Sequence, residues 1–178
     1  RQTLEGILHY RFQPTNLLVT FHPVTLDGRP SEGQFQELLR AFDRLGPEVG
    51  LIFTLPNADP EGRALIRAVE AYVSTRAHAR AFSSLGQHRY LSVMAQVDAV
   101  VGNSSSGLYE APTLGKPTVN IGDRQRGRMQ ASSVVNCEPE EAAIVAAIRA
   151  ALALDARGAV NPYGDGQSAR RIRERLAA

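Results

Sequence analysis

Short, continuously apolar runs alternate along the chain with segments of helical periodicity, and this alternation limits the possible folds more than any other feature. The runs are rich in Leu and Val and stop at polar residues or proline, which is typical of strands buried on both faces. The segments between them repeat apolar residues three and four positions apart, which is helical spacing. We therefore predict an α/β fold: a Rossmann-like parallel sheet flanked by helices, with right-handed crossovers.

The pattern also predicts where the elements lie. Strands are expected at residues 17–21, 49–55, 80–83, 98–102 and 117–121, with a sixth around Val134 and Val135. Helices are expected at residues 32–45, 61–75, 89–96, 107–114, 139–154 and 168–176. The length of 178 residues suits a single domain, residues 1–178.

Charge and cysteine content narrow the class of protein. With 20 basic and 18 acidic residues the net charge is +2, and no dense basic block is present, which argues against a nucleic-acid partner. No apolar run has the length of a membrane span. Cys137 is the single cysteine, so we interpret it as a small buried hydrophobe in a reducing, cytoplasmic compartment. The start at Arg1 rather than Met, with no visible signal peptide, indicates an excised fragment or a processed product.

In a parallel α/β sheet, ligands bind beyond the carboxyl ends of the strands. Four polar loops follow predicted strands and are the candidate binding loops. They span residues 22–25, 56–59, 102–107 and 122–128.

The most informative loop is Gly102-Asn103-Ser104-Ser105-Ser106-Gly107, between a predicted strand and a predicted helix. The first amides of a helix lack internal partners, small residues let a phosphate approach them, and serine hydroxyls add donors. Glu110 follows one turn later, where its carboxylate can accept hydrogen bonds from a ribose diol. The alternative is that Ser104 or Ser105 only caps the helix.

Other motif readings of these segments fail on spacing. Gly102 to Gly107 has the glycine spacing of a P-loop, but Leu108-Tyr109 replaces the required Lys-Ser/Thr. Ser106 stands where a nucleophile elbow needs its second glycine. The Gly164–Ala169 segment imitates a dinucleotide fingerprint without the preceding strand.

Taken in order, the loops resemble the UDP-N-acetylglucosamine 2-epimerase family, from about Leu17 to Leu176. The motifs that carry the resemblance are Thr20-Phe21-His22-Pro23-Val24-Thr25, Pro56-Asn57-Ala58-Asp59, Gly102 to Pro112, Leu114 to Gln125, and Asn161-Pro162-Tyr163-Gly164-Asp165-Gly166. The Asn-Ser-Ser-Ser-Gly and Asn-Ile-Gly-Asp-Arg-Gln wording is similar to the hydrolysing branch, which makes free N-acetylmannosamine or a related sugar for sialic-acid-type synthesis. The family pairs two Rossmann-like domains in a GT-B-type fold, and this chain resembles the second.

The resemblance also implies roles for individual residues. It implies that Ser104 and Ser105 contact the diphosphate of a UDP-sugar, within the loop that ends at Gly107, that Glu110 binds the ribose, and that Arg124 approaches the diphosphate or the sugar. Further implied site residues are a catalytic His22 and Asn57 lining the cleft, and Leu85 and Tyr90 at the uracil. The family's acid–base residues lie largely in the first domain, so that missing N-terminal domain is an expected partner and the isolated chain is expected to be inactive. No cofactor is expected, and the intact enzyme is expected to be a homo-oligomer.

Several interpretations stay open at this stage. His22 can be structural, Tyr90 can be a core residue, and Arg124, Arg126 and Arg128 can form a solvated loop. The remaining histidines are scattered without metal-ligand spacing, so no metal site is predicted. The function itself has two alternatives: the donor-binding domain of a GT-B-type glycosyltransferase, or a non-catalytic nucleotide-sugar-binding domain.

Overall fold

A parallel sheet forms the centre of the molecule. The computed structural model describes residues 1–24, 30–58 and 60–177, so Thr25 and Asp59 of the two strand-end motifs lie outside the described residues. Within these ranges six strands pair in the order β3-β2-β1-β4-β5-β6, all parallel. The strands are β1 (Thr15–Thr20), β2 (Val49–Thr54), β3 (Ala79–Phe82), β4 (Ala99–Gly102), β5 (Thr118–Ile121) and β6 (Val134–Cys137). The predicted Rossmann-like sheet is thereby confirmed.

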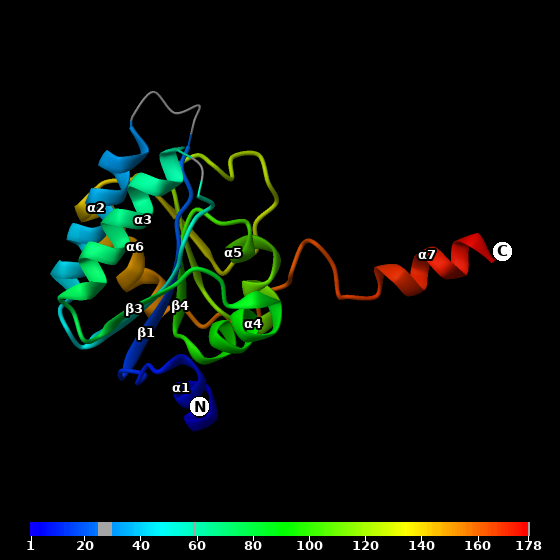
Figure 1. Ribbon diagram of the computed structural model, residues 1–178. Coiled ribbons are helices and arrows are strands. Elements are labelled where there is room, and N and C mark those ends of the chain that lie inside the picture. Colours follow the sequence, from blue (N-terminus) through cyan, green and yellow to red (C-terminus); the bar gives the residue numbers. More distant parts are fainter. Residues whose placement is uncertain (25–29, 59, 178) are drawn as a thin grey trace.

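Helices cover both faces of this sheet (Figure 1). One face carries α2 (Ser31–Leu45), α3 (Pro60–Ser74) and α6 (Glu141–Ala153), which pack against the sheet in one apolar cluster. The other carries α1 (Gln2–Leu8), α4 (Gly86–Gln96), α5 (Ser106–Tyr109) and the 3₁₀ turn η1 (Ala111–Leu114). The last helix, α7 (Ser168–Leu176), projects away from the body of the domain.

Burial on both faces explains why the strand sequences are continuously apolar. Leu17 and Val19 of β1 point into the cluster of α2, α3 and α6, whereas Leu18 points into the cluster of α1 and α4. All three side chains are fully buried. Successive side chains of a strand face opposite ways, so a strand covered on both sides has no solvent-facing position to fill with a polar residue.

Besides shifts of one or two residues at several element ends, the structure differs from the predicted elements in three places. Helix α1 was not predicted, because its seven residues contain too little periodicity to stand out. The helix expected at residues 107–114 is two pieces, α5 and η1, since Pro112 offers no amide to continue an α-helix. Helix α4 begins at Gly86, three residues before the predicted start. The predicted α7 has the observed bounds.

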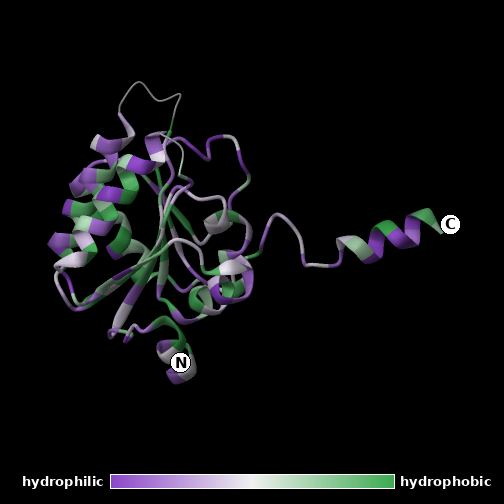
Figure 2. Cartoon of the chain, in the orientation of Figure 1, coloured by the Kyte–Doolittle hydropathy of each residue, from purple (hydrophilic) through white to green (hydrophobic). Residues whose placement is uncertain are grey.

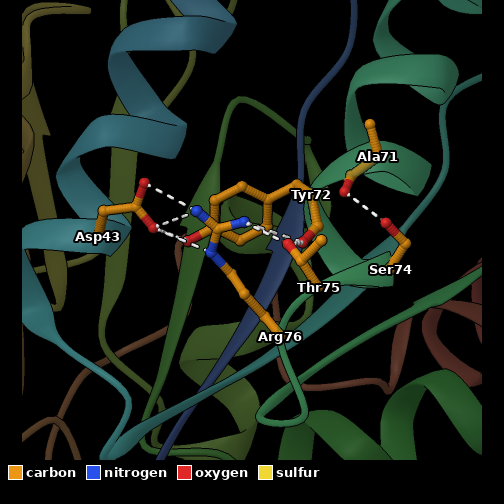
Figure 3. A network of polar contacts seen from close by, with 6 residues as sticks. All are labelled: Asp43, Ala71, Tyr72, Ser74, Thr75 and Arg76. Carbon is orange, nitrogen blue, oxygen red and sulfur yellow. Dashed lines mark hydrogen bonds and ion pairs between the residues drawn. The ribbon is translucent and has the colours of Figure 1, made fainter.

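A charged network joins α2 to α3 at the amino edge of the sheet (Figure 3). Asp43 accepts hydrogen bonds from the Tyr72 hydroxyl at 2.9 Å and from Arg76 Nε at 3.0 Å and Nη2 at 3.1 Å. The Arg76 guanidinium also stacks 3.7 Å from the Tyr72 ring centroid. The network fastens two helices to each other at the edge opposite the strands' carboxyl ends.

Cys137 at the end of β6 is half-buried rather than fully buried, and it packs against the larger apolar cluster. Burial raises the pKa of its thiol to about 12, which makes it a poor nucleophile at neutral pH. Across the described ranges, no helix combines the length and apolar character that crossing a bilayer requires.

Candidate functional site

The carboxyl ends of four neighbouring strands meet in one row at one edge of the sheet. Thr54, Thr20, Gly102 and Asn120 are register partners across β2, β1, β4 and β5. The strand order reverses direction between β1 and β4, and a doubly wound sheet opens its ligand crevice at such a switch point. The loops that leave β1 and β4 there contain His22 and the three serines.

The β1 and β4 backbones approach each other closely at this point. Gly102 has a φ of 137°, and a Cβ placed on it would stand 2.0 Å from the Thr20 carbonyl oxygen. Glycine is therefore required where the serine loop begins. Gly107 closes the loop for a similar reason, because a Cβ there would lie 2.5 Å from Thr118 Cγ2 of β5. The expected role of Gly107 thus has a packing component that lets α5 sit directly on the sheet.

The serine loop presents several hydrogen-bond donors at the crevice. Ser104 and Ser105 are half-buried, and neither amide donates a hydrogen bond within the part of the chain that the structure describes. Ser105 stands at the N-cap of α5 without forming a side-chain cap. The Ser104 hydroxyl accepts a long 3.4 Å bond from the Ser106 amide and a 3.1 Å bond from the Ser106 hydroxyl. Helix capping therefore does not account for the two serines. Because α5 has only four residues, the donors themselves matter more here than a helix dipole.

Glu110 lies at the junction of α5 and η1 and is half-buried. Burial raises the pKa of its carboxyl group, and a bond from its own backbone amide opposes this only in part. Its Oε2 is buried and has no hydrogen-bond partner among the described residues. Buried polar atoms are rarely left unpaired, so this carboxylate oxygen can accept a hydrogen bond from a group that the described residues do not supply.

Asn103 ties the loops of the crevice together, and our reading of the sequence did not single it out. Its side chain bonds both backbone groups of His22, and its carbonyl oxygen accepts from Arg124 Nη1 at 3.1 Å and Gln125 Nε2 at 2.7 Å. The three loops after β1, β4 and β5 therefore meet at one buried amide. The available signal in the sequence was a polar residue directly after a fully apolar strand.

The three loop arginines differ in what they contact. Arg126 forms an ion pair with Asp123, and Arg128 donates to the Tyr109 hydroxyl at 2.8 Å. Arg124 makes no ion pair within the described ranges, and it lies next to the serine loop through its bond to Asn103. Burial and the nearby positive charge of Arg128 lower the pKa of Arg124. Arg124 is thus the member of the three that both lacks an ion pair among the described residues and borders the serine loop, where its guanidinium can meet an anion.

Tyr90 of α4 packs partly as a core residue and also contacts the serine loop. Its ring packs against the second apolar cluster, and its hydroxyl lies 2.6 Å from Ser106 Oγ in the serine loop. Burial raises the pKa of Tyr90, so it stays neutral and can donate. The Leu85 side chain is buried in the same cluster at the start of α4.

The remaining predicted site residues lie on the same edge of the sheet. His22 is half-buried directly after β1, and Asn57 is exposed in the loop after β2. Elsewhere in the described chain, as here, no three His, Cys, Asp or Glu side chains converge as metal ligands would.

Comparison with known proteins shows the family to which the chain belongs. The sequence model described as UDP-N-acetylglucosamine 2-epimerase matches residues 2–177. The chain belongs to the UDP-N-acetylglucosamine 2-epimerase family. It is 36% identical over 139 residues to the GDP/UDP-N,N'-diacetylbacillosamine 2-epimerase (hydrolyzing) of Campylobacter jejuni, covering 78% of this chain and 36% of that protein. It is 29% identical over 169 residues to the UDP-N,N'-diacetylbacillosamine 2-epimerase (hydrolyzing) of Legionella pneumophila, covering 94% and 44%.

Solved structures of the family share the fold. The Methanocaldococcus jannaschii UDP-GlcNAc 2-epimerase, crystallised with UDP-GlcNAc and UDP, aligns with a TM-score of 0.76 at 13% identity, covering 99% of this chain and 49% of that one. Family membership confirms the resemblance seen in the loop motifs. It also agrees with the expected GT-B-type half, because the chain spans less than half the length of the relatives it matches.

Proposed function

We propose that the full-length protein is a hydrolysing UDP-N-acetylhexosamine 2-epimerase and that this chain supplies its UDP-binding half. One observation carries the proposal: among the described residues, a buried carboxylate oxygen without a partner, on Glu110, lies five and six residues after the unpaired amides of Ser105 and Ser104. A ribose diol needs an acceptor, and a diphosphate needs several donors. Both requirements are met along one short segment.

The remaining groups of the crevice fit the departure of UDP from the sugar. In the proposed reaction UDP is eliminated, water then adds to the unsaturated sugar, and C2 is inverted. Negative charge grows on the departing diphosphate oxygen, and donors placed there stabilise the transition state more than the substrate. Arg124 supplies positive charge, and we propose His22 as the donor to the departing oxygen.

The acid–base groups that move the proton at sugar C2 belong, in this proposal, to the rest of the protein. We assign Glu110, the carboxylate that follows the serine loop, to binding, and Asp123 of the β5 loop is held in an ion pair with Arg126. General acid–base catalysis requires groups within hydrogen-bond reach of the substrate. We therefore expect the 178-residue chain to bind UDP without turning over a UDP-sugar.

Calorimetry on the 178-residue chain tests the binding half of the proposal. UDP should bind, and Ser105→Ala should weaken it by about tenfold or more, because a hydrogen bond to a charged group contributes about 1.5–3 kcal/mol. Ser74→Ala, on α3 at the opposite edge, is the matched control and should leave the affinity unchanged. No measurable UDP binding by the parent chain would rule the site out.

Turnover by the full-length protein tests the reaction. Incubation with UDP-N-acetylglucosamine and, separately, with UDP-N,N'-diacetylbacillosamine should release UDP and a free 2-epimerised sugar such as N-acetylmannosamine. His22→Ala should lower kcat by about 10²-fold with little change in melting temperature. Sugar transfer to an acceptor instead of water would show a glycosyltransferase, and binding without turnover would show a non-catalytic protein. Unfolding of His22→Ala with an unchanged rate in the folded remainder would make His22 structural.

A further inference from the structure

Asn103 is fully buried and uses its hydrogen-bonding groups on residues of two other loops. Its Oδ1 accepts from the His22 amide at 2.7 Å, and its Nδ2 donates to the His22 carbonyl oxygen at 2.8 Å. The Asn103 side chain thereby binds both the backbone amide and the backbone carbonyl group of His22, a residue 81 positions away in the sequence. The Asn103 carbonyl oxygen holds Arg124 and Gln125 in turn.

The chemistry of this clamp requires an amide of this length. His22 presents one donor and one acceptor, and only a side chain with one of each satisfies both. An aspartate in this place would bring a second oxygen against the His22 carbonyl oxygen, where an N–H group now lies. An alanine would remove both bonds to the His22 backbone, each of which makes a net contribution to stability.

The clamp lies at the switch point between β1 and β4, where two parallel strands end side by side and their chains diverge. Loops that leave such a point have no ladder partners to fix them. Asn103 supplies hydrogen bonds between these loops instead. Its side chain joins the β1 loop to the serine loop through His22, and its carbonyl oxygen joins the β5 loop to them through Arg124.

We propose that Asn103 is the positioning residue of the site: its side chain sets where His22 stands relative to Ser104 and Ser105, while its main-chain carbonyl holds Arg124. This inference rests on the proposed function for its effect on UDP, but its geometric part does not. The donors of a leaving-group site act only when they are held in productive geometry before the reaction, and misplacement by about 1 Å can cost 10²-fold in rate.

The chain contains a matched control for this residue. Asn16, also fully buried, uses the same clamp on Gln13: its Oδ1 accepts from the Gln13 amide at 2.9 Å, and its Nδ2 donates to the Gln13 carbonyl oxygen at 2.7 Å. It lies near the amino end of β1, at the edge opposite the crevice. Replacing either asparagine by aspartate therefore damages an equivalent clamp, and only one of the two clamps is at the site.

The experiment compares Asn103→Asp with Asn16→Asp in the full-length protein. Both should lower the melting temperature by similar amounts, whereas only Asn103→Asp should lower kcat, by about tenfold or more. In the 178-residue chain, only Asn103→Asp should weaken UDP binding. Acidification should narrow the affinity gap between Asn103→Asp and its parent, because a protonated carboxyl regains a donor for the His22 carbonyl oxygen. Asn103→Ser, whose hydroxyl can meet one of the two His22 groups, provides a milder variant if Asn103→Asp does not fold.

Hydrogen exchange separates failure of this inference from failure of the proposed function. Amides in residues 21–24 should exchange faster in Asn103→Asp and at the parent rate in Asn16→Asp, whether or not UDP binds. Equal exchange and equal kcat in the two variants would overturn the positioning role while leaving the function intact. Faster exchange in a protein that does not bind UDP would support the positioning role and overturn the function.

Discussion

The proposed binding role of Glu110 conflicts with the stability of the fold. Burial of its carboxylate lowers stability, whereas the proposed function needs that carboxylate to bind a ribose. Its folded-state pKa lies above the ordinary value because burial disfavours the charged form. In the pH window between the unfolded and folded pKa values the native state holds the extra proton, so stability falls as the pH rises through that window. At neutral pH the ionised carboxylate therefore destabilises the ligand-free fold.

We accordingly predict that Glu110→Gln raises the melting temperature of the ligand-free chain at neutral pH and weakens UDP binding by about tenfold or more. The difference in melting temperature should shrink on acidification, as the parent carboxyl becomes neutral. Scanning calorimetry at several pH values and titration with UDP measure the two effects, with Glu70→Gln on the exposed face of α3 as the control. A destabilised Glu110→Gln with parent-like UDP affinity would show that the carboxylate serves the fold instead.

At the residue scale, the sequence predicted the groups that lie in polar loops and missed those that act across them. Ser104, Glu110 and Arg124 were identifiable because they follow strands that end at one edge. The Asn103 clamp was not, since its partner is 81 residues away and only the register of β1 against β4 brings them together. Which candidate contacts UDP is a matter for the binding experiments.

At the scale of elements, periodicity identified five helices within three residues of their observed starts and all six strands, because each buries a face that its sequence displays. What it could not show is how neighbouring helices are fastened to each other. Asp43 on α2 and Tyr72 and Arg76 around the end of α3 form such a fastening through polar side chains. Contacts of this kind leave no periodic trace in the sequence.

We predict that Asp43→Ala lowers the unfolding free energy by about 1–2 kcal/mol, because it removes bonds to a cation and a buried hydroxyl from a half-exposed site. UDP affinity should stay at the parent value, since the network lies at the edge opposite the crevice. Asp155→Ala removes a fully surface-exposed pair with Arg157 and should leave the unfolding midpoint unchanged in the same urea titration. Equal effects of the two substitutions would mean that the α2–α3 network adds nothing beyond a surface ion pair.

At the scale of the whole molecule, α7 stands apart because it contributes no buried side chain to the domain. None of its residues is buried, and Ile172 and Leu176, one turn apart, are 59% and 84% exposed. Figure 2 shows apolar and polar residues interleaved along this helix, which projects clear of the domain. A helix with one apolar stripe is typical of an element that packs against another surface. Structures twice as long as this chain align with 99% of it. We propose that the remainder of a longer protein covers that stripe.

We therefore predict that Ile172→Asp combined with Leu176→Asp leaves the melting temperature of the 178-residue chain unchanged but lowers that of the full-length protein by several degrees. Burying two such side chains contributes about 1.5–3 kcal/mol each, and about 1 kcal/mol shifts the midpoint by roughly 2–4 °C in a domain of this size. Arg170→Ala with Glu174→Ala, on the polar side of the same helix, controls for loss of helicity. If the apolar stripe instead joins two copies of the chain, light scattering will show a dimer of the 178-residue protein that the double aspartate variant abolishes. That result would assign α7 to self-association and contradict its packing within one full-length molecule.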